Sequence, residues 1–315
     1  MKLIDSIKRF IKYLPYVANT SKSSNINSYP DTENTTENTN FYVPPGHFYS
    51  PIPSLEYVRN NLNNIFKPLP RIIPGIDLRE SQQMELLQSL KIYYDQVPFS
   101  EKKQNDTRFY FNNPSYSYLD AIFLYSIIRH KKPRRIIEIG SGFSTCVMLD
   151  TNDLYFDGNK IAITCIEPYP DLLLSLLKPG DIDQITLIAK DLQQVDLKIF
   201  GQLEENDILF IDSTHVSKIG SDVNYEIFEL LPSLAPGVLI HFHDIFFPFE
   251  YPLDWVLENR GWNELYLLRA FLQYNDSFNI VLFSSFLINF FENYFSENMP
   301  MCLRNSGGNI WIQRN

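Results

Sequence analysis

The stretch that decides the fold is RRIIEIGSGFST, residues 134–145. Its apolar run ends in two glycines, Gly140 and Gly142, and glycines there let a strand turn sharply into a helix and approach a ligand closely. Glu138 stands where a dinucleotide-binding fingerprint has its first glycine, so the spacing is not Gly-x-Gly-x-x-Gly. A carboxylate at this turn would repel a pyrophosphate and suits a cofactor that carries a sulfonium or an amino group. The turn therefore favours S-adenosylmethionine over NAD.

Outward from this turn, short apolar runs alternate with helical stretches from Pro133 onward. Uninterrupted apolar runs of this length are typical of parallel strands that are buried on both faces. Right-handed crossovers place the first and fourth strands side by side at a switch point, where a ligand binds. The last two strands follow a longer insertion and are expected to form a hairpin-like pair. The expected strands are Arg135–Ile139, Ile161–Ile166, Ile185–Ile188, Asp207–Ile211, Gly237–Phe242, Phe278–Phe283 and Asn309–Ile312, with helices near Ser144–Asp150, Leu172–Leu177 and Val223–Leu231.

The second strand ends in an acidic residue, Glu167, which is well placed to hold both hydroxyls of a ribose. Helix capping or simple exposure is its structural alternative. Tyr169 lies between two prolines and either stacks on an adenine ring or anchors the loop. Asp191 follows the third run and is a candidate for a contact on the adenine side of the cofactor.

Polar side chains also follow the fourth and fifth strands, where ligands bind in open α/β sheets. The fourth ends in Asp212 and His215, and the fifth in His243 and Asp244. Two chemical uses remain open. A histidine could act as the general base on a substrate hydroxyl, or Asp212, Asp244 and a histidine, with His243 as the tentative third ligand, could hold a divalent cation such as Mg²⁺. His241 shares a strand face with His243 and is expected to be a buried core histidine.

Three segments are expected along the chain. Residues 1–40 combine a basic amphipathic helix over residues 3–14 with a polar linker; this helix docks on the body or on a partner, or lies on an anionic membrane surface. Residues 41–132 form a proline- and tyrosine-rich appendage with helices at Ser81–Tyr94 and Tyr118–His130. Residues 133–315 form the cofactor-binding domain.

Composition narrows the class of partner. The chain has 27 Lys and Arg against 37 Asp and Glu, a formal net charge of −10, which argues against nucleic acid as a partner. Its three cysteines have no paired spacing, which fits a reducing compartment and excludes a cysteine-based zinc site. No apolar run is long enough for a transmembrane segment, and no signal peptide is evident, so a cytoplasmic enzyme is expected. The sequence leaves the oligomeric state open.

The stretch from Arg134 to Asp244 resembles class I S-adenosylmethionine-dependent methyltransferases, in particular the catechol O-methyltransferase-like group and its bacterial relatives. The glycine turn, the acidic second-strand tip and the aspartates at the fourth and fifth tips occur in that family's order. The strings FYSPIP, residues 48–53, and HFHDIF, residues 241–246, also resemble bacterial proteins described only as methyltransferases. The resemblance implies a Rossmann-like, seven-stranded, mostly parallel, doubly wound sheet of order 3-2-1-4-5-7-6.

The resemblance also implies roles for single residues. Those expected to line the cofactor are Glu138, Gly140, Ser141, Gly142, Ser144, Glu167, Tyr169, Asp191 and Asp212. Asp212 and Asp244 match positions that hold magnesium in metal-dependent members. Those members carry an Asn directly after the second of these aspartates, whereas this chain has Ile245, so a histidine would have to complete a metal site.

The function expected from these features is methyl transfer from S-adenosylmethionine to a hydroxyl of a small molecule or sugar, with His215, His243 and Asp244 as the catalytic residues. The segment before Pro133 would be a lid over the acceptor. Two alternatives share the fold: a metal-dependent modifying enzyme of the hydroxylase type, and a non-catalytic methyltransferase-like scaffold.

Overall fold

The computed structural model describes residues 42–315, so the expected amphipathic helix and linker within residues 1–40 lie outside the described residues. The described chain divides into two compact units. The larger unit contains Pro68–Trp255 and Trp262–Asn315, and the smaller contains residues 42–67 together with Val256–Gly261.

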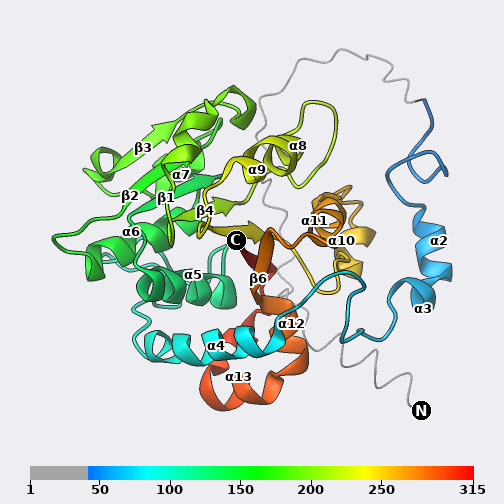
Figure 1. Ribbon diagram of the computed structural model, residues 1–315, viewed down its shortest axis with the longest axis horizontal. Helices are drawn as coiled ribbons and strands as arrows, with labels where there is room; N and C mark the ends of the chain where they lie inside the picture. The colour runs from blue at the N-terminus through cyan, green and yellow to red at the C-terminus, as the bar shows by residue number, and fades with distance from the viewer. Residues whose placement is uncertain (1–41) are drawn as a thin grey trace. The chain divides into compact units, whose positions relative to one another are not determined.

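The larger unit is built on one seven-stranded sheet of order β3-β2-β1-β4-β5-β7-β6, as predicted. Figure 1 shows β3, β2, β1 and β4 side by side. The first five strands are parallel, and β7 runs antiparallel between β5 and β6. The strands are β1 Arg135–Ile139, β2 Ala162–Ile166, β3 Ile185–Ile188, β4 Ile208–Ile211, β5 Leu239–His243, β6 Phe278–Phe283 and β7 Asn309–Arg314.

Burial explains why these runs became central strands. Every residue of β4 and β5 is buried, and so are four of the five residues of β1. Strands covered on both faces need apolar side chains at successive positions, which is the pattern seen in the sequence. The helices of the larger unit are α4 Glu80–Tyr94, α5 Tyr118–Lys131, α6 Phe143–Tyr155, α7 Asp171–Leu176, α8 Asp222–Tyr225, α9 Leu231–Ser233, α11 Glu264–Leu272, α12 Ser284–Phe290 and α13 Glu292–Asn298. Helix α10, Leu253–Leu257, crosses the boundary between the units. A π-helical turn, Glu226–Leu230, joins α8 to α9, and 3₁₀ turns occur at Asp181–Gln184, Leu192–Gln194, Leu197–Gln202 and Pro300–Arg304.

Residues 68–132 belong to the same compact unit as the sheet. The expected division at residues 40 and 132 stays a prediction. Helix α5 is buried at every residue from Tyr118 to Ile128, not on one face only, because it packs between α4 and α6. It ends where Lys132 adopts a left-handed φ of 53° before Pro133, since proline disfavours a helical conformation in the residue that precedes it. The lid role of this region stays a prediction.

A buried ion cluster ties the segment before α5 to the sheet's helices. The guanidinium of Arg108 donates to Asp150 on α6 at 2.8 Å and to Asp181 at 2.6 Å. Asp150 also accepts the backbone N–H groups of Arg108 and Phe109. One guanidinium thus faces two buried carboxylates, and both carboxylates also accept backbone N–H groups, which offsets part of the cost of burying the charges.

The smaller unit holds two short helices, α2 Leu55–Asn60 and α3 Leu62–Ile65. Helix α2 begins at Ser54, whose hydroxyl accepts the backbone N–H of Tyr57 in the manner of an N-cap. The side chain of Ile52 packs against Gly261, where an added Cβ would lie 2.4 Å from Ile52 Cδ1. Across residues 42–315, none of the helices has the length and apolar character needed to cross a membrane.

Candidate active site

The glycine turn brings three strand ends together at Gly140. This residue has a φ of +78°, and an added Cβ would lie 1.8 Å from the carbonyl oxygen of Asp212 at the end of β4. Its N–H donates to the carbonyl of Ile166 at the end of β2, at 3.0 Å. Only a residue without a side chain permits this approach, so the glycine sets the spacing between the first, second and fourth strand tips.

Glu138 lies beneath this turn and is completely buried. Its carboxylate accepts the hydroxyls of Ser144 and Thr145, at 2.6 and 2.5 Å, in the first turn of α6. The structure thus places Glu138 and Ser144, both predicted cofactor contacts, against each other, where they hold α6 on β1. Burial raises the pKa of Glu138 from 4.5 to about 7, although the hydroxyls of Ser144 and Thr145 oppose the rise.

This raised pKa predicts a pH-dependent stability. A carboxyl whose folded pKa exceeds its unfolded pKa stabilises the fold fully below the unfolded value, and that stability is lost as the pH rises through the folded value. We expect the free energy of unfolding of the parent, relative to Glu138→Gln, to fall by about 1–3 kcal/mol between roughly pH 4.5 and 7. Urea denaturation of both proteins across that interval measures the difference. A difference in the free energy of unfolding that does not change with pH would contradict the raised pKa of Glu138.

At the tip of β2, the Glu167 carboxylate lies near the hydroxyl of Ser141. Glu167 is half-buried and accepts the backbone N–H groups of Ser141 and Tyr169, at 3.1 and 2.8 Å. The Ser141 hydroxyl is buried without a hydrogen-bond partner among the described residues. A buried orphan hydroxyl next to a reachable carboxylate fits a polar ligand at this edge. Tyr169 is 79% exposed, and Asp191 is exposed just beyond β3.

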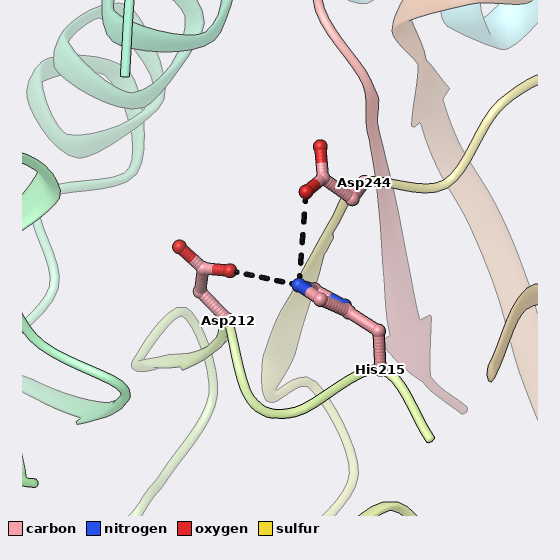
Figure 2. A group of neighbouring side chains, drawn as sticks. All are labelled: Asp212, His215 and Asp244. Carbon is pink, nitrogen blue, oxygen red and sulfur yellow. Dashed lines mark ion pairs between the residues drawn. The ribbon is translucent and has the colours of Figure 1, made fainter. Parts of the chain in front are cut away.

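The polar tips of β4 and β5 meet, as the sequence predicted. Figure 2 shows the Asp212 and Asp244 carboxylates turned toward the same imidazole nitrogen of His215. His215 Nε2 lies 3.3 Å from Asp212 Oδ1 and 3.6 Å from Asp244 Oδ2. One ligand-type atom from each residue lies within 4.8 Å of the other two, a spacing that could hold a metal ion.

Two of these three residues have an uncommon backbone conformation. His215 and Asp244 have φ values of +60° and +55°, in the left-handed region that side chains disfavour. Such conformations persist only where the surroundings enforce them, and they gather at functional sites. At His215 the surroundings are visible: its carbonyl accepts the N–H groups of Asn263 and Glu264, at 3.0 and 3.1 Å, where α11 begins.

The electrostatics of the cluster couple the imidazoles to the carboxylates. Burial disfavours the charged form of His215, but its hydrogen bonds to Asp212 and Glu264 raise its pKa well above the ordinary value. Burial likewise opposes the charge of Asp212, yet His243 and His215 hold its pKa below the ordinary value. Burial raises the pKa of Asp244 to about 6, against the attraction of the two histidines.

His243, the third metal ligand named from the sequence, is not part of the group of three; His215 takes that position. Its Nε2 lies 3.6 Å from Asp244 Oδ1, and its ring packs 5.2 Å from that of Tyr116. His241 is fully buried and stacks on Phe210, as expected of a core histidine. Ile245, which directly follows Asp244, is also fully buried.

The family described as "Methyltransferase domain" matches residues 137–245, which run from β1 to the end of β5 and include the whole cluster. An uncharacterized protein of Archaeoglobus fulgidus is 38% identical over 170 residues, which cover 52% of this chain and 75% of that protein. Residues 137–245 are therefore a methyltransferase domain.

Solved structures similar to this methyltransferase include the SAH-bound PaMTH1 of Podospora anserina, at 17% identity and a TM-score of 0.45, covering 78% of this chain and all of that one. Another is the O-methyltransferase of Bacillus cereus in complex with SAH, at 15% identity and a TM-score of 0.38, covering 82% of this chain and 97% of that one.

One residue at the centre of the candidate site was not predicted from the sequence. Glu264 is 1% exposed, and its Oε2 lies 2.8 Å from His215 Nδ1. It begins a helix 49 residues after His215, and no strand-tip or motif argument points to a helix start. The only local signal was an acidic residue in a first helical turn, which is common for reasons of helix stability.

Proposed function

We propose that this methyltransferase transfers the methyl group of S-adenosylmethionine to a hydroxyl of a small molecule or sugar. The observation that carries the proposal is the Asp212–His215–Asp244 cluster, which lies directly beside the glycine turn because Gly140 touches the backbone of Asp212. A hydroxyl must lose its proton as it takes up a methyl group. Nε2 of His215 lies between two carboxylates, and Asp212 and Glu264 raise the pKa of the ring against the effect of burial, so Nε2 is a strong proton acceptor once the imidazole is neutral.

The cofactor would lie along the tips of β1 and β2. Glu167 would accept the two ribose hydroxyls, Ser141 would offer its free hydroxyl, and Tyr169 would present its exposed ring to the adenine. Gly140 and Gly142 keep side chains away from the path of the methionine part. In this arrangement Glu138 lies beneath the glycine turn and fixes the first turn of α6 through its hydrogen bonds. S-adenosylmethionine supplies the electrophilic methyl group.

Asp212, His215 and Asp244 also suit a divalent cation, because two carboxylates and one imidazole form a donor set that binds Mg²⁺ or Mn²⁺. When bound there, the cation would lower the pKa of the acceptor hydroxyl. The residues themselves would orient the acceptor. The Asp212 side chain is one-third exposed, so an acceptor can contact it, whereas the His215 ring is held in place by Glu264. His243 would keep Asp244 in place from the other side.

The test is formation of S-adenosylhomocysteine by purified protein incubated with S-adenosylmethionine and a panel of phenols, catechols and sugars, each assayed with Mg²⁺ and with a chelator. Methylated product whose new methyl group is on oxygen supports the proposal. Products methylated only on nitrogen or carbon would overturn it.

Cofactor binding gives a separate prediction. We expect Glu167→Ala to weaken S-adenosylmethionine binding by about 10- to 100-fold, because two hydrogen bonds to a charged acceptor are lost. Calorimetric titration measures the change, and Glu229→Ala, an exposed carboxylate away from the turn, serves as the matched control. Absence of binding by the parent protein at millimolar ligand would refute the cofactor site itself.

A further inference from the structure

Behind the cluster, Glu264 forms two hydrogen bonds with His215. The Glu264 carboxylate lies 2.8 Å from Nδ1 of the ring, and the Glu264 backbone N–H donates to the His215 carbonyl at 3.1 Å. One contact fixes the ring and the other fixes the left-handed backbone. Both residues are buried, His215 to 5% and Glu264 to 1% exposure, so water does not compete for these bonds.

The contact between the Glu264 carboxylate and Nδ1 determines which ring nitrogen of His215 faces Asp212 and Asp244. A carboxylate only accepts hydrogen bonds, so Nδ1 must carry the proton that it shares with Glu264. Nε2 is then the nitrogen presented to Asp212 and Asp244. Without Glu264 the preference would reverse, because the Asp212 carboxylate near Nε2 would favour a proton on that nitrogen. A protonated Nε2 can neither take a proton from a substrate nor bind a cation.

We propose that Glu264 is a positioning residue that keeps His215 Nδ1 protonated and so leaves Nε2 free for the reaction or for a divalent cation. Carboxylate–histidine pairs behind a reactive or metal-binding nitrogen act in this way, and their loss typically weakens metal binding by about 10- to 100-fold. The part that concerns the cation rests on the proposed function, whereas the part that concerns the imidazole does not.

A second buried carboxylate provides the matched control. Glu226 lies in the π-helical turn and is fully buried, yet neither of its oxygens has a hydrogen-bond partner among residues 42–315. Glu226→Gln therefore removes a buried acid that interacts electrostatically with Glu264 and His215 but makes no hydrogen bond to the His215 ring, so it separates the effect of the hydrogen bond from that of nearby charge.

The first experiment records the ¹⁵N shifts of His215 in the cation-free parent, Glu264→Gln and Glu226→Gln over a rising pH series that continues until the ring is neutral, because Asp212 and Glu264 raise the pKa of His215 well above its ordinary value. We expect a protonated Nδ1 in the parent and in Glu226→Gln, and an appreciable population with the proton on Nε2 alone in Glu264→Gln. An unprotonated Nδ1 in the parent, or identical shifts in the parent and Glu264→Gln, would overturn the proposal.

The second experiment titrates the same three proteins with Mn²⁺ and follows the free ion by electron paramagnetic resonance. We expect the dissociation constant to rise about 10- to 100-fold in Glu264→Gln and to stay near the parent value in Glu226→Gln. Equal affinity in the parent and Glu264→Gln would contradict the positioning role. A parent that binds no Mn²⁺ refutes the proposed cation, and the ¹⁵N shifts then decide the role of Glu264 alone.

Discussion

Methyl transfer is expected to fall by about 10²- to 10⁴-fold when His215 is replaced with alanine, the range typical for loss of a positioned acid or base. Within residues 42–315, the His215 imidazole is the one group with ion-pair contacts to both Asp212 and Asp244, so its removal leaves the two carboxylates with neither the imidazole between them nor a third ligand. The loss should appear in turnover. S-adenosylmethionine affinity should be retained, because the predicted ribose and adenine contacts come from other strands.

The measurement is the rate of S-adenosylhomocysteine formation with an acceptor that the parent methylates, together with calorimetric cofactor binding. His130→Ala is the matched control, since His130 lies in the last turn of α5 and is no part of the cluster. Full turnover by His215→Ala would remove the imidazole from the reaction. A parallel loss of cofactor affinity would show that the variant damages the fold instead.

Gly140→Ala is expected to lower the free energy of unfolding by about 4 kcal/mol or more, a size seen only for severe steric or packing defects. The new methyl group would lie 1.8 Å from a backbone oxygen of Asp212, and neither strand can retreat because both are central in the sheet. The φ of +78° adds backbone strain for any residue that has a Cβ. Failure to recover folded protein is the extreme form of the same result.

Gly142→Ala is the control for this prediction. Gly142 has an extended φ of −177°, and an added Cβ would meet only the Leu172 side chain, at 3.4 Å. Urea denaturation should therefore place Gly142→Ala within about 1 kcal/mol of the parent. Equal stability of Gly140→Ala and the parent would mean that β1 and β4 do not meet at this glycine.

The strand order could be predicted because it depends on features that are local in sequence. Each buried strand is a short apolar run, and right-handed crossovers leave few ways to arrange such runs. The ends of strands were less accurate: β5 begins at Leu239 instead of Gly237 and extends to His243, and β7 continues to Arg314. Hydrogen bonding to neighbours sets these limits, and apolar character does not reveal it.

For the site, the sequence predicted which strand ends meet but not which histidine joins the two aspartates. Asp212 and Asp244 follow neighbouring parallel strands, so their proximity follows from the topology. The choice of His215 over His243 could not be made, because it depends on a left-handed turn four residues beyond the strand end. The cofactor role expected for Glu138 stays a prediction, and its burial could not be predicted because it depends on the hydroxyls of Ser144 and Thr145 reaching back from the helix.

The position of β7 has a consequence for how the protein is made. This strand lies between β5 and β6, so β5 has an unpaired edge until residues 309–314 arrive. Asp244 follows β5 directly, and the backbone N–H of Ile245 is held by Gly308, immediately before β7. During synthesis, residues 309–314 must therefore leave the ribosome before the fifth strand is covered and the site acquires its final geometry. Until then, an apolar strand edge stays open to mispairing, and chaperones would be expected to bind there.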